Sequence, residues 1–331
     1  MTAHARKEHR RWMRFAVART IQLGLAAILA CALAFALTTI APIDPIAAYL
    51  GPAGAHIDAA QEAQIAARWG VNEPPIERFF AWARNALRGD LGVSPIFNRP
   101  VAEVLAERAG ASLALMAIAW ICSGVLGFTL GLVAGGWRDT WIDRIIRTCA
   151  YTLTAAPTYW VAMILLLVFS VSLGWAPVCC AGPVGALPEE VGFVERLHHL
   201  ALPAAALSLL GVAHIALFTR QKTIDVMTSE FVTFAKAQGA SRGEILVRHA
   251  ARHAAAPALM LQFATIGELF GGSVLAEAVF TYPGLGRAAV EAGLRGDAPL
   301  LLGVTLFMAI IVSLGALIAD ILSAPRLGEQ S

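Results

Sequence analysis

The chain has little charge and lacks the motifs of a self-contained ATPase. Of its 331 residues, 15% are Asp, Glu, Lys or Arg, whereas 58% are hydrophobic. It contains only three lysines, Lys7, Lys222 and Lys236, and none of them follows a glycine. A phosphate-binding loop of the Gly-Lys-Ser/Thr kind is therefore excluded, and so is an HExxH metalloprotease helix. We expect a chain that is not an enzyme and binds no cofactor itself.

Cysteine and histidine are too sparse to predict a metal site. The five cysteines, at positions 31, 122, 149, 179 and 180, have no CxxC spacing. His249 and His253 have the i, i+4 spacing of metal ligands, but a third ligand is missing. We therefore interpret them as partner-facing or membrane-edge residues. The adjacent Cys179 and Cys180 could form a vicinal disulfide or contact a metal, and we favour two ordinary loop thiols.

Long apolar stretches take the place of a soluble core. The composition is far from the soluble average, and a helix needs about 20 apolar residues to cross a bilayer. Because the stretches lack the strict alternation of a membrane barrel, the sequence predicts an all-α integral membrane protein. Six transmembrane helices are expected, at residues 15–41, 111–136, 144–173, 197–219, 253–280 and 299–322.

The first apolar stretch has two interpretations. It follows a basic run at residues 1–14, as the core of a signal peptide would. A signal core is only about 7–15 residues long, however, and Thr20–Ala41 is long enough to span a membrane. We predict a retained helix with a cytoplasmic N-terminus.

Residues 42–110 have mixed polarity and predict a water-facing, extracytoplasmic insertion after the first helix. Two pieces within it are amphipathic, residues 58–69 and 76–87, and Asp58 is expected to cap the first. The five remaining helices form a core at 111–323, followed by a short cytoplasmic tail at 324–331.

Small residues and proline predict how some of these helices pack. Gly127, Gly131 and Gly135 recur at four-residue intervals, which favours close approach of a neighbouring helix. Pro157 is expected to kink the third span.

Charge indicates the orientation. With a cytoplasmic N-terminus, sixteen of the 25 Lys and Arg residues fall inside and nine outside. Acidic residues show the opposite bias, eight inside and thirteen outside. A basic cytoplasmic side is the usual arrangement, so both termini are predicted to be inside.

The basic stretch 222–252 is the longest polar segment between the later spans. Its apolar residues recur at helical spacing from Lys222 to Gln238, and Gly239 supplies a stop. Ser241 and Glu244 have the spacing of a capping box, in which each side chain bonds the other residue's amide. The pattern predicts two helices around a glycine elbow, or, in the simpler alternative, an ordinary basic loop.

Two segments resemble one known family. Phe231–Ser241, Leu246–His253 and Pro257 resemble the cytoplasmic coupling loop of permeases from binding-protein-dependent ABC importers, in the peptide and nickel branch. Glu277–Arg287 resembles the second signature of that branch, with Pro283, Gly284, Gly286 and Arg287. The wider superfamily begins its loop with Glu-Ala-Ala, where this chain has Thr233-Phe234-Ala235, so the likeness is to the peptide branch specifically.

The resemblance implies a type I ABC importer permease in the bacterial inner membrane. The expected partners are two ATPase subunits that carry ATP and magnesium, a second homologous permease and an extracytoplasmic solute-binding protein. Peptides are the expected substrate, with nickel or a metal chelate as the alternative. The residues expected to couple to the ATPases are Phe231, Phe234, Ala235, Lys236, Gly239, Ser241, Arg242, Glu244 and Arg248.

Two carboxylates lie within the predicted fifth span. A charge in lipid is costly unless it faces a cavity or a partner. Glu268 is a candidate for the translocation path. Glu277 has the same candidate role, with a cap or helix-packing hydrogen bond as its alternative. A different class of function would use both residues as ion sites in a secondary transporter; a membrane enzyme is a third, disfavoured possibility. The sequence does not identify the solute.

Overall fold

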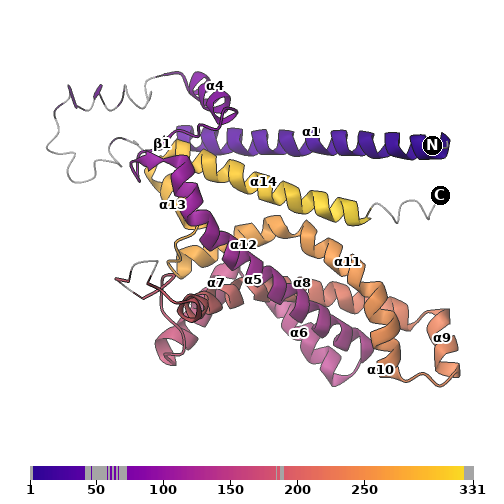
Figure 1. Ribbon diagram of the computed structural model, residues 1–331. Helices are drawn as coiled ribbons and strands as arrows, with labels where there is room; N and C mark the ends of the chain where they lie inside the picture. The colour runs from indigo at the N-terminus through magenta and orange to yellow at the C-terminus, as the bar shows by residue number, and fades with distance from the viewer. Residues whose placement is uncertain are drawn as a thin grey trace. The chain divides into compact units, whose positions relative to one another are not determined.

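A computed structural model gives the fold of the chain (Figure 1). It describes residues 3–41, 46, 58, 60–61, 63–64, 66, 73–183, 185–186 and 190–323. Most of the predicted insertion up to residue 72, the side chains of the basic N-terminus and the tail at 324–331 therefore lie outside the described residues. At the described start of the insertion, the Gln61 amide donates to Asp58 Oδ1 over 2.7 Å, which confirms the predicted cap.

The described elements are helices apart from one short hairpin. The hairpin pairs β1 (Val93–Ser94) with β2 (Arg99–Pro100) in antiparallel register. The helices are α1 (Ala3–Ile40), α4 (Pro75–Ala86), α5 (Val101–Gly136), α6 (Trp141–Ala155), α7 (Thr158–Leu165), the π-helix η2 (Leu166–Ser172), α8 (Phe193–Met227), α9 (Glu230–Ala237), α10 (Arg242–Ile245), the π-helix η3 (Leu246–Ala250), α11 (Ala251–Ala264), α12 (Ile266–Val279), α13 (Leu285–Arg295) and α14 (Ala298–Ser323).

Two compact units share these elements. Unit 1 joins the residues up to Ala109 with Ala288–Leu314, and unit 2 joins Gly110–Arg287 with the residues from Gly315 on. The core of unit 1 packs α1 against α14 and α4 around Cys31, Phe35 and Leu302. The core of unit 2 includes Leu115, Leu200, Leu207 and Tyr282.

Length and composition allow up to six membrane spans among the described residues. Four single helices qualify, at Val17–Ile40, Val101–Gly136, Phe193–Met227 and Ala298–Leu322. Two bent pairs qualify if each is one span: α6 with α7–η2 bends by 109°, and α10–α11 with α12 bends by 54°. These pairs cover the predicted third and fifth spans. Pro157 stands at the first bend, between α6 and α7, as predicted.

The glycine stripe lies where α5 meets α8 inside unit 2. A Cβ atom added at Gly131 would stand 2.6 Å from Thr219 Cβ, and one at Gly135 would stand 2.5 Å from Thr223 Cβ. Gly127 is similarly close to Ile215, at 2.8 Å. Real Cβ atoms do not approach this closely, so only glycine allows this helix separation, and the predicted packing role is confirmed.

Candidate functional site

A connecting segment, residues 228–250, joins the end of α8 to α11. The prediction of one helix from Lys222 to Gln238 is wrong, because α8 ends at Met227 and α9 begins at Glu230. The Thr228 hydroxyl donates to Ile224 O over 2.9 Å, and the Ser229 hydroxyl donates to Val226 O over 2.6 Å. Such side-chain bonds compete with the backbone hydrogen bonds of a helix. The break therefore depends on the polar side chains of Thr228 and Ser229, and the spacing of the apolar residues does not reveal it.

The predicted stop at Gly239 is confirmed in detail. Its φ is +88°, in the left-handed region that favours glycine. The Ala240 amide donates to Ala235 O over 3.1 Å, and the Gly239 amide donates to Lys236 O over 3.0 Å. This pair of bonds is the Schellman arrangement, which closes a helix and reverses the chain in a fixed geometry.

The capping box at Ser241 is formed only on one side. Ser241 Oγ accepts from the Glu244 amide over 3.3 Å, as predicted. The Glu244 carboxylate does not reach back as expected; it accepts from Arg248 over 2.6 Å, one turn further along the helix. An exposed i, i+4 ion pair competes for the same carboxylate, which accounts for the difference.

The letters Gly239-Ala240-Ser241-Arg242-Gly243 also match a nucleophile elbow. That motif needs a strand before the serine. Here Ser241 follows helix α9 and its hydroxyl caps α10, so the match carries no catalytic meaning.

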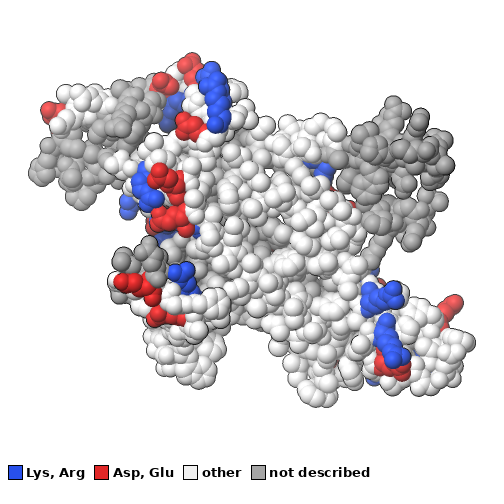
Figure 2. Space-filling model, viewed as in Figure 1, with Lys and Arg blue, Asp and Glu red and all other residues white. Residues whose placement is uncertain are grey.

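The predicted coupling residues of this segment are mostly exposed. Phe234 is 65% exposed and Lys236, Arg242 and Arg248 are also exposed, while Ala235 is half-buried. Val247, which the sequence reasoning missed, is 71% exposed. Figure 2 shows charged side chains gathered over α9 and α10.

Phe231, which was predicted to contact an ATPase subunit, also contacts residues of its own chain. Its ring stacks on His253 with centroids 5.5 Å apart and lies 5.8 Å from the His249 ring. Val232 and Ile245 of the same segment are fully buried. Phe231 and the two histidines therefore help to hold α9 against the start of the next long helix.

A buried ion pair that sequence reasoning missed lies beside this segment. Arg220 Nε and Nη2 donate to the two carboxylate oxygens of Asp143 over 2.6 and 2.8 Å. Asp143 is fully buried and also accepts from the Asp139 amide over 2.9 Å. The pair fastens the start of α6 to α8 seven residues before α8 ends. In the sequence both residues are charged positions near predicted loops, with no pattern that pairs them.

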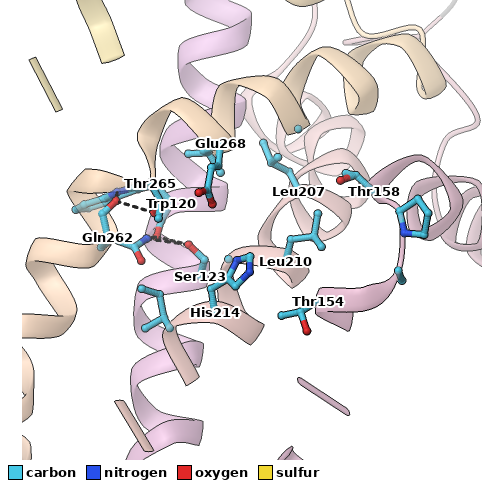
Figure 3. A pocket seen from close by; sticks show the side chains of 16 residues that line it. Trp120, Ser123, Thr154, Thr158, Leu207, Leu210, His214, Gln262, Thr265 and Glu268 are labelled. Carbon is cyan, nitrogen blue, oxygen red and sulfur yellow. Dashed lines mark hydrogen bonds between the residues drawn. The ribbon is translucent and has the colours of Figure 1, made fainter. Parts of the chain in front are cut away.

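A cavity of about 290 Å³ opens among the helices of unit 2 (Figure 3). Its walls combine polar groups with leucine and isoleucine side chains. Figure 3 shows the Glu268 carboxylate from α12 and the His214 imidazole from α8 directed into this space. The polar lining residues are Ser123, Thr154, Thr158, His214, Gln262, Thr265 and Glu268.

Gln262 joins two walls of this cavity. Its Nε2 donates to Ser123 Oγ over 2.8 Å and to Trp120 O over 2.6 Å, and Trp120 Nε1 donates back to Gln262 O over 3.0 Å. The side chain therefore clasps α11 to α5. Sequence reasoning predicted Glu268 for this region but missed Gln262 and His214, because an isolated polar residue in an apolar run gives no sign of which wall it faces.

Glu277 lies in a different environment from Glu268. It is fully buried, and Glu277 Oε1 accepts from the Ser112 hydroxyl over 2.6 Å. Its second oxygen accepts from the Arg287 amide over 3.0 Å, at the start of α13. A carboxylate at a helix N-terminus is a favourable cap. Among the described residues Glu277 does not line the cavity, so its geometry favours the cap over the translocation role.

The second signature wraps around this carboxylate. A Cβ atom at Gly284 would collide with the Glu277 carboxylate and the Ser112 hydroxyl. Pro283 precedes Gly284 in the turn between α12 and α13, and Gly286 is the second residue of α13, where an added Cβ would stand 2.6 Å from Val274 Cα. The Arg287 guanidinium donates to Thr281 O over 3.0 Å. Burial raises the pKa of the neighbouring Tyr282, and the Glu277 charge raises it further, so this phenol stays neutral. The signature residues therefore build a tight turn.

Cys179 and Cys180 form a disulfide, which corrects the expectation of two free thiols. The Cys180 amide donates to Phe280 O over 3.0 Å, which ties this loop to the end of α12. Sequence reasoning weighed the bond but had no means of placing the two sulfur atoms. Within the described part of the chain, no group of three or more His, Cys, Asp or Glu residues is placed to hold a metal ion.

Known proteins match the region that contains these features. The model of the family described as "Binding-protein-dependent transport system inner membrane component" matches residues 127–324, which include the connecting segment and every residue of the cavity lining except Trp120 and Ser123. The chain belongs to this family. It is thus a membrane permease component of an ABC importer, as the two sequence signatures indicated.

Individual relatives align with the permease over almost its whole length. The oligopeptide transport system permease protein AppB of Bacillus subtilis (strain 168) is 32% identical, over 88% of this chain and 91% of its own. A putative peptide transport system permease protein of Brucella abortus (strain 2308) is 32% identical, over 88% and 90%. The glutathione transport system permease protein GsiC of Escherichia coli O6:H1 is 30% identical, over 94% and 97%.

Proposed function

We propose that this permease forms half of a translocation path for peptides and is driven by ATPase subunits on other chains. The observation that carries the proposal is the polar cavity within unit 2. Its lining comes from α5 and α8, which are long and apolar enough to span a membrane, and from the two bent helix pairs that qualify if each pair is one span. Polar side chains inside a span are costly unless they serve a cavity or a partner. Uptake of a labelled peptide by proteoliposomes that contain the complete transporter tests the proposal.

The proposed substrate class follows from the relatives and suits the cavity. The names printed for the similar permeases refer to oligopeptides, peptides and glutathione. Glu268 offers a carboxylate for a substrate ammonium group, and Gln262 and Ser123 offer amide and hydroxyl groups for a peptide backbone. The nickel or metal-chelate alternative lacks comparable support from these names. Competition of unlabelled peptide against nickel in the same uptake assay separates the two.

Coupling is proposed to pass through the connecting segment. Phe234 and Val247 supply exposed apolar surface, and Lys236, Arg242 and Arg248 supply exposed charge, for a groove on an ATPase subunit. From Arg242 the chain continues without a break through η3 and α11 to Ala264, two residues beyond Gln262. At its other end the segment is joined directly to the last residue of α8, and α8 contributes His214 to the cavity. A displacement of the segment therefore reaches two cavity walls along stiff helices.

The remaining parts of the proposed assembly are a second permease, two ATPase subunits with ATP and magnesium, and a solute-binding protein. The second permease would supply the other half of the path. We also propose that the assembly imports its substrate across a bacterial inner membrane, and that both termini of this chain are cytoplasmic. Accessibility of residues 230–250 to a membrane-impermeant reagent from the inner face checks the orientation.

The secondary-transporter alternative rests on Glu268 alone, because Glu277 is engaged by Ser112 and the start of α13. An ion gradient would then drive uptake without nucleotide. Transport by vesicles that contain this chain and no ATPase subunit would favour that alternative.

A further inference from the structure

Helix α4, which follows the first span in sequence, has an apolar arc that is only half covered. The covered half lies in the core of unit 1, where Phe79 and Trp82 pack against the cluster that Cys31 and Phe35 of α1 form with Ala298 and Leu302. The rings of Phe35 and Phe79 have centroids 5.6 Å apart. The Arg78 guanidinium lies 5.7 Å from the centroid of the same Phe35 ring, which fixes the rotation of α4 about its own axis.

The open half of the arc is a stripe of large apolar side chains. Ile76, Phe80 and Leu87 are 71%, 65% and 90% exposed. Their spacing of four and seven residues places them on one side of the helix, directly beside the covered half. Arg84, Arg88 and Glu77 border this stripe on its polar side. An apolar stripe so fully exposed, with basic residues along its edge, needs an occupant.

The depth of α4 along α1 indicates what that occupant is. The span Val17–Ile40 has 24 residues, or about 36 Å of helix, slightly more than the hydrocarbon core of about 30 Å. Phe35 stands five residues before the end of the span, about 7 Å inside it. Phe79 packs on Phe35 at this depth, so this part of α4 lies near the boundary between acyl chains and headgroups.

The first span also exposes apolar side chains at the depth where α4 packs. At the same level of α1, Leu33 and Leu37 are large apolar residues on the exposed side of a membrane span. A water-soluble protein would have to reach below the end of the span to cover the stripe, whereas lipid is present there already. Arginines at the edge suit the phosphate groups of phospholipids, which lie just outside the acyl chains.

We propose that α4 is an interfacial helix, whose Ile76, Phe80 and Leu87 side chains enter the bilayer while Arg84 and Arg88 contact lipid phosphates. These contacts anchor α4 itself to the membrane surface beside α1. The inference requires only that α1 spans the membrane and is independent of the transported solute.

Photocrosslinking in the complete transporter tests this inference. The variants Phe80→p-benzoylphenylalanine and Asn85→p-benzoylphenylalanine are assembled in nanodiscs of phosphatidylcholine and phosphatidylglycerol at three to one. They are irradiated with and without the solute-binding protein and analysed by mass spectrometry. Asn85 is exposed on the polar side of the same helix, and Leu33→p-benzoylphenylalanine on α1 serves as the positive control for lipid contact.

The expected result is a phospholipid adduct at position 80, at a level comparable with position 33 and at least fivefold above position 85. Adducts with the solute-binding protein or with another part of the chain would overturn the inference. So would no adduct at position 80 when position 33 reacts. If the Phe80 variant does not assemble, the same substitution at Leu87 is tested, with the same outcomes.

Discussion

Glu268 is the residue whose replacement tests the cavity most directly. Its carboxylate is directed into a space that is otherwise lined by uncharged groups and His214. A hydrogen bond to a charged group contributes about 1.5–3 kcal/mol. Glu268→Gln, which keeps the shape, is therefore predicted to lower uptake of a peptide with a free amino terminus by about tenfold or more. Initial uptake rates in proteoliposomes measure this.

The matched control is Glu195→Gln. Glu195 is exposed near the start of α8 and does not contribute to the cavity wall as described. Its replacement should leave uptake within about twofold of the unsubstituted transporter. Equal uptake by both variants would remove Glu268 from the translocation path.

The Asp143–Arg220 pair is predicted to be a major contributor to the stability of unit 2. Removing one partner of a buried ion pair leaves an uncompensated charge and costs about 3–5 kcal/mol. Asp143→Asn should therefore lower the free energy of unfolding by roughly that amount. The exposed Lys222–Asp225 pair, at 3.7 Å, provides the control. Exposed pairs contribute about 1 kcal/mol or less, so Asp225→Asn should change little in denaturant titrations of the detergent-solubilised chain.

At the residue scale, sequence reasoning identified groups with a local signature and missed those that act over distance. Gly239 and Ser241 are identified by the helix ends that they form, and both were predicted. Asp143 and Arg220 are separated by 77 positions, and no local pattern connects them. Glu277 was noticed as a costly charge, but its hydrogen bond to Ser112 depends on the folded chain.

Among the elements, the turn between α9 and α10 has the strictest backbone requirement. Gly239→Val is predicted to cost about 1–2 kcal/mol, because β-branched residues do not tolerate a φ of +88°. Since no atom lies within 4 Å of an added Cβ, the cost comes from the backbone alone. Uptake should fall about tenfold, while membrane insertion persists and ATP hydrolysis becomes independent of substrate.

Two substitutions control this prediction. Gly239→Asn should retain most uptake, because Asn adopts left-handed geometry more readily than other residues. Gly243→Ala, within helix α10 and also free of nearby atoms, should be neutral or slightly stabilising. Normal coupling in Gly239→Val would show that the fixed turn is dispensable.

The contact between α5 and α8 yields a second prediction for an element. Gly131→Ala places a methyl group where Thr219 and the Ala216 carbonyl already stand. Overpacking of this kind typically costs about 1–3 kcal/mol. Gly271→Ala on α12, where the added methyl meets no atom within 4 Å, should be tolerated. Thermal unfolding of the two variants in the same detergent compares them, and equal midpoints would contradict the close approach.

The sequence predicted the helices well where a long apolar stretch is sufficient to identify a membrane span. All six expected stretches fall on helical segments, because a run such as Ala298–Leu322 has no alternative in a bilayer. The break at Thr228 was hidden because Ile224 and Phe231 continue the helical spacing across it. The 54° bend before α12 was missed for a similar reason: the helix is interrupted at Thr265, and the residues on either side of it, Ala264 and Ile266, are neither proline nor glycine.

For the whole molecule, the central prediction concerns the energy source. The chain lacks a phosphate-binding loop, so peptide accumulation should require ATP and the ATPase subunits. Proteoliposomes with the complete transporter, loaded with ATP or with a non-hydrolysable analogue, measure this. Accumulation with the analogue, or after omission of the ATPase subunits, would contradict the proposed mechanism.

The family could be recognised from the sequence because its two signatures lie in turns with strict geometry. The full set of residues that line the cavity could not be recognised from the sequence, because they come from elements between α5 and α12 that are brought together only in the folded chain. The substrate is harder still to infer, since Glu268, Gln262 and His214 are compatible with many peptides.

The glycine contact between α5 and α8 limits how the cavity can change shape. Helices held together by backbone-distance packing shift as one body, so these two walls cannot separate from each other. The opposite wall, α11, meets α5 through the hydrogen bonds of Gln262, which water or a peptide group can replace. The Trp120 indole adds a hydrogen bond to the Gln262 carbonyl and a ring contact with Phe263. A movement of α11 away from α5 would break these contacts, so the hydrogen-bonding state of Gln262 should differ between the two ends of the transport cycle.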